Sequence, residues 1–352
     1  MSTRHWPLKY MGVCLASVTL WVACPPESKA ACTIAVTAGD DANTCDSGTA
    51  AGFTDTGGNN SLTFPTASTG VISGNVLYGA GNDQVEMNGD GGQINGALNQ
   101  GDGANIFRLF KGIVTGTVTQ GAGADVIQIS GGQAGAISQG AGIDSFSMSG
   151  GKIASLAQGD GLDVFFMSGG EITGAFEDGD QAKMTGGTIG RVDMKLDNNL
   201  FAMSGGTIVN NLVTAFGNDT ILISGTSFIG GNISTSGGTD LIQITGGVVN
   251  GQILASFGND TFIWSDAGQV RGFILMGGDN DTALLKNLTD TQLSSTALLD
   301  GGAGDDTLTF ETPGPQHRSD TPTGKRFGST TARSSPSVAT SYWATVALEP
   351  VR

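Results

Sequence analysis

Histidine is nearly absent from this sequence. Only two of the 352 residues are histidine, His5 near the start and His317 near the end, so a Ser-His-Asp site in the middle of the chain is excluded. Basic residues are scarce too, and residues 30–312 carry 29 acidic and 8 basic side chains, a net charge of −21. Phosphate binding needs clustered Lys and Arg, so we expect no nucleic-acid partner. An acidic body instead favours solubility and the binding of cations or basic partners.

Aromatic residues make up 7% of the chain and charged residues 14%, whereas glycine accounts for 58 residues. This is too little charge for ordinary disorder. It is also too much glycine for long helices, because each interior glycine costs about 1 kcal/mol in a helix. The composition therefore indicates an all-β fold with many turns.

The first 30 residues are predicted to be a signal peptide. Arg4 and Lys9 provide a positive start, residues 10–23 are mostly apolar, and residues 28–30 (Ser-Lys-Ala) resemble a cleavage site. A lipoprotein signal ending at Cys24 is the alternative. No other segment is apolar enough to span a membrane as a helix, so we expect no transmembrane helix in the mature chain. The protein is then exported through an inner membrane.

Cysteine is rare in the expected mature chain, which keeps only Cys32 and Cys45. An even pair near the start of an exported chain predicts a disulfide bond that caps the N-terminal end. The alternative is two unpaired small side chains. Neither cysteine has a histidine close to it in the sequence, which argues against thiol catalysis.

The chain contains an internal repeat of about twenty residues. Segments such as GAGADVIQISGG from residue 121 and GDGLDVFFMSGG from residue 159 are almost alike. One acidic or amide residue precedes the apolar run of each repeat, at spacings of 17 to 25 residues. These anchors are Asp83, Asn105, Asp125, Asp144, Asp163, Asp180, Asn199, Asp219, Asp240, Asp260, Asp281 and Asp306.

The residues two and four positions after each anchor are apolar in all 24 cases, as in Phe165 and Met167 after Asp163. Apolar residues at a period of two predict a half-buried strand. Glycine pairs that follow each strand predict sharp corners. One repeat therefore makes two or three short strands and returns beside itself, and stacked repeats bury a continuous core. Met148, Met167, Met184 and Met203 should stack in one column.

We therefore predict an all-β fold, a single-stranded parallel β-helix (solenoid) of about twelve rungs of about twenty residues. Residues 80–312 form the repeat domain, and residues 31–79 form an N-terminal cap and the first rungs. Leucine-rich repeats have a similar period, but this sequence has no recurrent Leu-x-x-Leu-x-Leu frame.

The leader, the early cysteine pair, rungs of the form GxGxDxFxMSGGxIxG and a closing GGAGDDTLTF resemble the passenger region of bacterial autotransporters. The resemblance covers about residues 30–312. It implies a right-handed parallel β-helix displayed at the outer membrane. It also implies a C-terminal translocator β-barrel, which the chain as given lacks.

Residues 313–352 depart from the repeat. The pattern ends at residues 312–315 (Thr-Pro-Gly-Pro), and the remaining segment is rich in Ser, Thr, Arg and Pro with a net charge of +3. We expect a disordered tail that adds nothing to the rod. It is interpreted as an out-of-frame or truncated end, with an ordinary linker as the alternative.

The acidic residues of the repeats are the candidates for catalysis. Enzymes that act on polysaccharides resemble this architecture and often place several Asp on one face. Asp160 with Asp163, and Glu177 with Asp178 and Asp180, are the densest groups here. A regular column supplies many similar environments rather than one acid and one base, so we expect no catalytic residues.

Calcium is the strongest alternative. Residues 301–309 (GGAGDDTLT) match the nonapeptide of the RTX proteins, and Asp305 and Asp306 are the best candidate ligands. In that family such nonapeptides come directly one after another, whereas one copy occurs per rung here. The Asp column is then interpreted as turn chemistry, in which each side chain bonds its own backbone two residues on. We expect no required cofactor and a fold that survives chelation.

The sequence therefore predicts a non-catalytic exported protein, at the cell surface or secreted if a translocator is present and otherwise periplasmic. Its expected role is adhesion, display or spacing, with an unknown host or matrix ligand as partner. The alternatives are an RTX-like calcium-binding secreted protein and a polysaccharide-acting β-helix.

Overall fold

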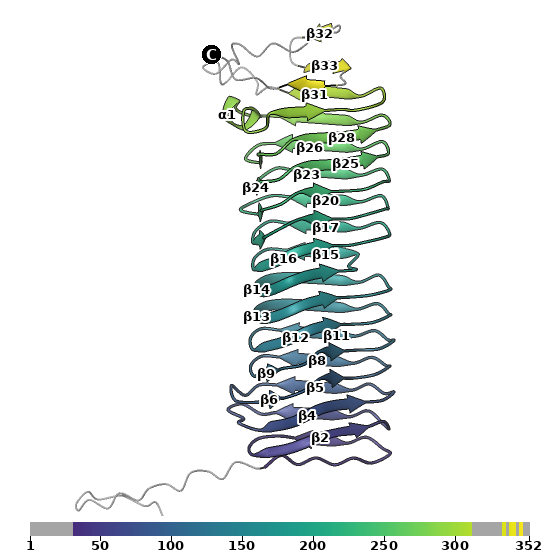
Figure 1. Ribbon diagram of the computed structural model, residues 1–352, viewed down its shortest axis with the longest axis vertical. Helices are drawn as coiled ribbons and strands as arrows, with labels where there is room; N and C mark the ends of the chain where they lie inside the picture. The colour runs from purple at the N-terminus through teal and green to yellow at the C-terminus, as the bar shows by residue number, and fades with distance from the viewer. Residues whose placement is uncertain (1–30, 312–332, 336–337, 343–344, 348–352) are drawn as a thin grey trace, which may run out of the picture.

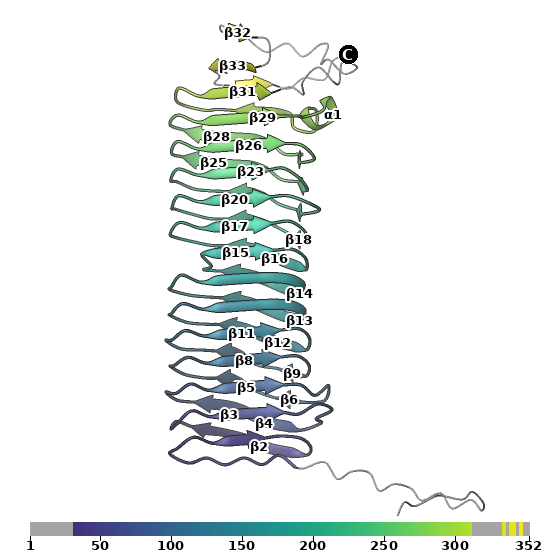
Figure 2. The ribbon, with the colours of Figure 1, turned by 180° about the vertical axis from the view of Figure 1, so that it is seen from behind.

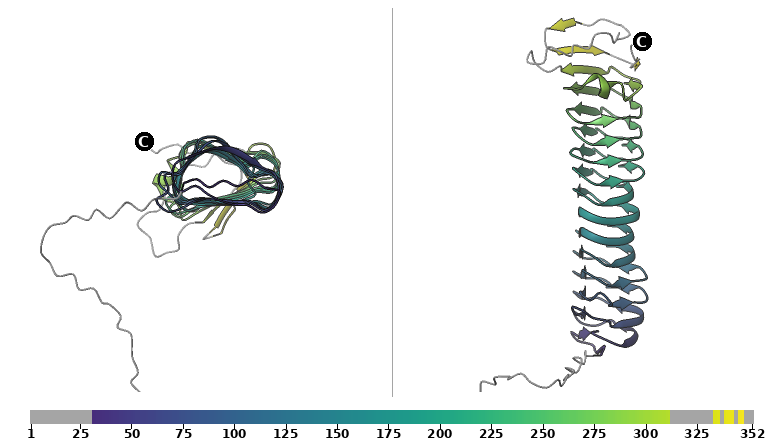
Figure 3. Two further views of the ribbon diagram at one scale, coloured as in Figure 1. Left: turned by 90° about the horizontal axis from the view of Figure 1, so that it is seen from below. Right: turned by 90° about the vertical axis from the view of Figure 1, so that its left-hand side faces the viewer.

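Residues 31–311 form one long β-solenoid in the computed structural model, which also describes three short strands between residues 333 and 347. Flattened coils stack along one axis (Figure 1), and seen along that axis they superimpose around a common interior (Figure 3). The predicted all-β parallel β-helix is confirmed. The predicted signal peptide lies outside the described residues.

The first face of the rod contains the strands that come after the anchor residues. They are β1 (Ala42–Thr44), β3 (Ser61–Phe64), β5 (Gln84–Met87), β8 (Ile106–Leu109), β11 (Val126–Ile129), β13 (Ser145–Ala157), β14 (Val164–Glu177), β15 (Gln181–Met184), β17 (Leu200–Met203), β20 (Thr220–Ile223), β23 (Leu241–Ile244), β26 (Thr261–Ser265), β29 (Thr282–Lys286) and β31 (Thr307–Glu311). Strands β13 and β14 continue around the coil onto the other faces.

The second face comes after the glycine corner. It contains β2 (Thr49–Asp55), β4 (Val71–Tyr78), β6 (Gln93–Ile94), β9 (Ile113–Val114), β12 (Gln133–Ser138), β16 (Thr188–Asp193), β18 (Thr207–Ile208), β21 (Phe228–Ile229), β24 (Val248–Val249) and β27 (Gln269–Val270). Several of these strands also extend onto the third face. The third face is completed by β7 (Leu98–Asn99), β10 (Val118–Thr119), β19 (Leu212–Val213), β22 (Ile233–Ser234), β25 (Ile253–Phe257), β28 (Ile274–Gly278) and β30 (Leu298–Asp300).

Neighbouring coils pair in parallel with identical repeat positions side by side. Phe146 pairs with Phe165, and Met148 pairs with Met167. The methionine column continues through Met184 and Met203, as the sequence predicted. Each coil therefore repeats the side-chain arrangement of the coil before it, so one repeat position becomes a column along the rod.

Both predicted apolar columns point into the interior. Of the 24 side chains, all are buried except Phe310 in the last coil, which is partly buried. Phe165 is 1% exposed, and its ring lies 5.6 Å from the ring of Phe146 and 4.1 Å from that of Phe176. The columns extend towards the N-terminus through Leu62 and Phe64. Burial of these columns is the main source of stability.

The two ends of the rod differ. At the N-terminal end, bridges from Ala31 to Ser47 and from Thr33 to Thr44 hold the first residues against the first coil. Near the C-terminal end, the short helix α1 (Asp290–Leu293) lies at the side of the rod near β29 (Figure 2). It begins with a capping box between Thr289 and Gln292.

Part of the tail differs from the sequence-based expectation. Strand β33 (Val338–Tyr342) pairs antiparallel with β31 and with β32 (Arg333–Ser335), and β34 (Thr345–Ala347) pairs antiparallel with β30. The last coil has no further coil beyond it, so its backbone groups form an open edge that another strand can satisfy. The remaining residues of the predicted tail lie outside the described part of the chain.

Close stacking at the corners requires glycine, which leads to a first prediction. Gly258 has a φ of 117°, and an added Cβ would overlap the carbonyl oxygen of Gly238 in the preceding coil. We expect Gly258→Ala to cost about 3 kcal/mol or more, from backbone strain and overpacking together. Gly48 is the matched control, since its φ is 72° but no atom lies within 4 Å of the added Cβ.

Gly48→Ala should therefore cost about 1 kcal/mol, from the strained φ alone. Urea denaturation monitored by circular dichroism measures both variants. Equal losses of stability in the two variants would mean that the close contact between coils contributes nothing.

Candidate functional site

The anchor residues form a buried polar column at one corner of the rod. The Oδ1 atom of Asp144 accepts a hydrogen bond of 2.8 Å from the backbone N–H of Asp125 in the preceding coil. The N–H of Asp144 in turn donates to Oδ1 of Asp163 at 2.7 Å. The same bond recurs along most of the rod, and we call this set of anchor side chains, from Asp41 and Asn60 to Asp306, the Asp column.

The structure corrects the sequence-based interpretation of this column. The side chains were expected to bond their own backbone two residues on, but the Oδ1 acceptors bond the neighbouring coil instead. The physical reason is the stacking, which brings the N–H of one anchor directly beneath the carboxylate of the next. The column therefore joins neighbouring coils to one another in addition to shaping each corner.

Asn105, an asparagine member of the column, satisfies both ends of its side chain. Asn105 Oδ1 accepts from the N–H of Asp83 at 2.9 Å. Its Nδ2 donates to two carbonyl oxygens of its own corner, Gly101 at 2.9 Å and Gly103 at 3.1 Å. Two carbonyl oxygens of the corner therefore accept hydrogen bonds from the same atom, Nδ2 of Asn105. In an asparagine, that atom carries the two hydrogens that the carbonyls need.

Aspartate members present an oxygen at the same place. Their first carboxylate oxygen makes the same bond to the preceding coil, so the second faces the corner in the position of the Asn105 amide nitrogen. In nine of them Oδ2 is buried and has no hydrogen-bond partner: Asp83, Asp125, Asp144, Asp163, Asp219, Asp240, Asp260, Asp281 and Asp306. A buried carboxylate oxygen without a hydrogen-bond donor is stabilised by a proton or a cation. At Asp219 and Asp240, the side chains of Thr214 and Thr235 also lower the carboxyl pKa by hydrogen bonding.

Burial changes the proton affinity of these carboxyls. Removal from water raises the pKa of Asp144, Asp163 and Asp281 to about 6, and the hydrogen bond from the preceding coil lowers it only in part. Burial, together with the carboxylates of Asp240 and Asp281, raises the pKa of Asp260 to about 7. At neutral pH, protons alone therefore leave much of the column charged.

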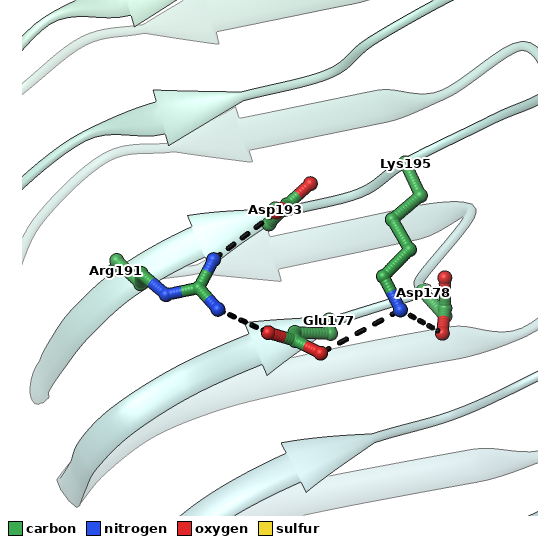
Figure 4. A network of polar contacts seen from close by, with 5 residues as sticks. All are labelled: Glu177, Asp178, Arg191, Asp193 and Lys195. Carbon is green, nitrogen blue, oxygen red and sulfur yellow. Dashed lines mark hydrogen bonds and ion pairs between the residues drawn. The ribbon is translucent and has the colours of Figure 1, made fainter.

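The column is interrupted halfway along the rod by an ion-pair cluster (Figure 4). Lys195 Nζ lies 2.7 Å from Asp178 Oδ2 and 3.5 Å from Glu177 Oε2. Arg191 pairs with Glu177 and, at 3.1 Å, with Asp193. The hydrogen bond with Asp178 raises the pKa of Lys195. Here the protein supplies its own cations to the corner region.

At the next corner an asparagine again supplies hydrogens to the corner carbonyls. The corner runs from Lys195 to Asn199, and Lys195 and Asp197 stand with positive φ where other corners have glycine. Asn199 Nδ2 donates to the carbonyls of Leu196 at 3.2 Å and Asp197 at 3.3 Å, whereas its Oδ1 is buried without a partner. The aspartates with an orphaned Oδ2 therefore fall into two groups, one on each side of residues 177–199.

The two predicted calcium ligands separate in the structure. Asp306 is 1% exposed and belongs to the Asp column, whereas Asp305 is exposed and lies outside it. Cys32 and Cys45 form a disulfide. In the described residues no group of three or more His, Cys, Asp or Glu side chains has the geometry of a metal cluster. This fits corners in which one carboxylate faces backbone carbonyls, a pattern that side-chain motifs do not reveal.

The acidic groups considered for catalysis do not converge into one site. Asp163 is buried in the Asp column while Asp160 is exposed. Glu177 and Asp178 are held by the ion pairs of Figure 4. Across residues 31–311 and the three tail strands, no helix is long and apolar enough to cross a membrane.

No protein-family model and no curated protein match the sequence. Among solved structures, the rod is similar to a hyperactive, Ca²⁺-dependent, β-helical antifreeze protein from an Antarctic bacterium. The match has a TM-score of 0.52 and 20% sequence identity, and it covers 80% of this chain and 86% of that one. At this identity the likeness establishes the β-helical fold alone.

Proposed function

We propose that this protein is an exported, non-catalytic β-solenoid that binds Ca²⁺ in the corners of its coils and serves as a rod for surface display or adhesion. One observation carries the calcium part of the proposal. Nine aspartates of the Asp column have a buried Oδ2 with no hydrogen-bond partner, and in the asparagine member Asn105 the atom at this place donates to two corner carbonyls.

Calcium fits these corners by its ligand preference. Ca²⁺ takes six to eight oxygen ligands, including carboxylates and backbone carbonyls, in flexible geometry. The orphaned Oδ2 of Asp260 and the carbonyls of its corner are oxygens of this kind, and the ion would replace the hydrogens that Asn105 supplies in its own corner. It would also neutralise a buried charge. This favours the alternative that the protein binds Ca²⁺ as RTX proteins do. Here the ion would bind at one corner of each coil, instead of between tandem nonapeptides.

The display part of the proposal rests on shape and on the resemblance to autotransporter passengers. A long rod with a repeated apolar interior separates its two ends at little cost per coil. The densest acidic groups do not converge into one site, since Asp163 is buried in the Asp column while Asp160 is exposed, which supports a non-catalytic role. A binding array of matrix proteins and glycans tests adhesion, and cleavage of an acidic polysaccharide would contradict the non-catalytic role.

We do not extend antifreeze activity to this chain. A shared fold does not by itself transfer an activity.

The test of calcium binding is a pair of reciprocal substitutions. Asp260→Asn replaces the orphaned oxygen by an amide like that of Asn105, so the variant should bind one fewer Ca²⁺ in calorimetric titration at about pH 7.5. In excess chelator it should unfold at a higher temperature than the original protein, because a buried charge is gone. Asn105→Asp should do the opposite, adding one ion and losing stability in chelator.

Two outcomes contradict the proposal. One is a wild-type protein that binds no Ca²⁺ at millimolar concentration. The other is a pair of variants whose stability in chelator is equal, since a corner that needs no cation would not distinguish a carboxylate from an amide.

A further inference from the structure

A cavity of about 340 Å³ opens on the outer side of the first face, and we call it the outer cavity. Its lining comes from four successive coils, with Phe110 in the first, residues 128–130 in the second, residues 147–149 in the third and Phe166 in the fourth. The coils that carry the two rings are three spacings apart, about 14 Å at a strand spacing near 4.8 Å. The volume is at the lower end of the range for small-molecule sites, about 300–1,000 Å³.

The two phenylalanines of the outer cavity are departures from the repeat. At the repeat position of Phe110 the next two coils carry Ser130 and Ser149, and at the position of Phe166 the preceding coil carries Ser147. No other coil between residues 80 and 312 has an aromatic residue at either position. Phe166 is 39% exposed, so its ring adds little to the core. Stacking of the coils explains the inward columns but does not require these two outward rings.

The hydroxyl groups between the rings are available to a ligand. In a later coil the serine at the same repeat position bonds the coil before it, since Ser224 Oγ donates to the carbonyl oxygen of Met203 at 3.3 Å. Among the described residues, no such bond holds the side chains of Ser130 and Ser149. Both are exposed in the lining of the outer cavity. They can therefore donate to a ligand and accept from it.

Gln128 adds an oriented amide to the lining. Arg108 Nε donates a hydrogen bond of 3.0 Å to Gln128 Oε1, and Arg108 also pairs with Glu86 at 3.7 Å. With the amide oxygen held in this way, the amide nitrogen is left to donate to a ligand. None of the lining residues is charged. The outer cavity thus offers two aromatic rings, hydroxyl groups and one amide, without a net charge.

A sugar ring matches this combination of groups. Its C–H bonds lie on the faces of the ring and can pack on an aromatic side chain, while its hydroxyls lie around the rim and can bond serine and glutamine. A purely apolar occupant would leave the polar lining without partners. An acidic sugar would be repelled by the rod, in which residues 30–312 carry a net charge of −21.

We propose that the outer cavity binds one or two rings of a neutral glycan between Phe110 and Phe166. The inference rests on the adhesion part of the proposed function and names its ligand class. It is independent of calcium binding, because no member of the Asp column lines the outer cavity.

Titration of the full chain with free sugars tests the site in solution. Maltose, lactose and cellobiose serve as neutral probes, and sialyllactose serves as the acidic probe. At least one neutral disaccharide should bind at millimolar concentration. In saturation-transfer NMR, irradiation of the aromatic protons should give the strongest transfer to the C–H protons of the sugar ring, because these pack on the phenylalanines.

Substitutions that follow the repeat place the sugar. Phe110→Ser and Phe166→Ser introduce the residue that neighbouring coils carry, so the fold should be retained in circular dichroism. Each should weaken binding of the neutral disaccharide at least about tenfold, because a central aromatic contact supplies much of the binding energy of such a site. The matched control is Val164→Ser. Val164 lies on the same strand as Phe166 and is 44% exposed, but it does not line the outer cavity. Its substitution should leave the affinity unchanged.

The outcomes separate this site from adhesion in general. No binding of a neutral sugar, equal affinity in the two phenylalanine variants and the original protein, or tighter binding of sialyllactose than of lactose overturns the inference. Retention on matrix proteins that Phe166→Ser leaves unchanged, with no sugar binding in solution, would uphold adhesion and overturn this site. Sugar binding in solution without retention on any immobilised ligand would uphold the site and contradict adhesion.

Discussion

In excess chelator, this protein should become less stable as the pH rises from about 5 to about 8, with a fall in unfolding temperature on the order of 10 °C or more. A change of 1 kcal/mol shifts the unfolding temperature of a domain of this size by about 2–4 °C, and several carboxyls of the Asp column titrate together. Most proteins gain or hold stability over this range as their carboxylates become charged and paired.

The sign comes from the direction of the pKa shifts. Burial raises the folded-state pKa of Asp144 and Asp163 from 3.8 to about 6, and that of Asp260 to about 7. Between the unfolded and folded values, the folded protein binds more protons than the unfolded chain, so stability falls with rising pH. The stabilising protonation is complete below about pH 4 and is lost as the pH passes through 6 to 7.

Calcium should reverse this dependence. At about pH 7.5 the ion takes the place of the missing protons and stabilises each corner by mass action, about 2.7 kcal/mol for a site at a hundredfold excess over its Kd. At about pH 5, protons compete for the same oxygens, so added Ca²⁺ should raise the unfolding temperature far less. Scanning calorimetry over pH, with chelator and with Ca²⁺, measures both effects. An unfolding temperature in chelator that does not vary with pH would show that the orphaned oxygens are satisfied in some other way.

The same scans test the sequence-based prediction that calcium is dispensable. The sequence marks the Asp column by its period but does not reveal what surrounds each carboxylate. The partner of the Asp144 carboxylate is a backbone N–H from another coil, and backbone atoms have no signature in a residue pattern. One signal was available, because Asn105 and Asn199 alternate with aspartate at the same position. An interchange of amide and acid at a buried position indicates a choice between hydrogens and a cation.

The fold itself was largely predictable. Apolar residues at every second position indicate a strand with one buried face, and a repeat of about twenty residues indicates a solenoid of stacked coils. Phe165 and Met167 lie inward where the pattern places them. The pairing of Asp55 with Tyr78 in the next coil was not predictable, because only the structure gives the register of the first coils. The antiparallel strands against the last coil were missed because pairing at an open edge depends on which segment folds back onto it, and the repeat pattern carries no such information.

Replacing Phe165 by Asp should destabilise the rod by at least about 5 kcal/mol, because it removes a buried aromatic ring and leaves a charge without a partner. The ring of Phe165 stacks with that of Phe146 in the preceding coil and with that of Phe176 in its own coil, so the damage should extend to the preceding coil. Its neighbour Val164 is 44% exposed and points to the other side of the strand. Val164→Asp should therefore cost under about 1 kcal/mol.

A third variant separates charge from volume. Phe165→Leu keeps an apolar side chain and should cost roughly 1–2 kcal/mol, so the difference between the Leu and Asp variants is the penalty of the buried charge. Unfolding of a long repeat rod need not be two-state, so the denaturation midpoint should be accompanied by hydrogen exchange of strands β13 and β14. In Phe165→Asp these amides should lose protection first, while strands near the ends of the rod keep it. Equal damage from Val164→Asp and Phe165→Asp would mean that the strand does not hold this register in solution, because a slip of one residue exchanges the inner and outer faces.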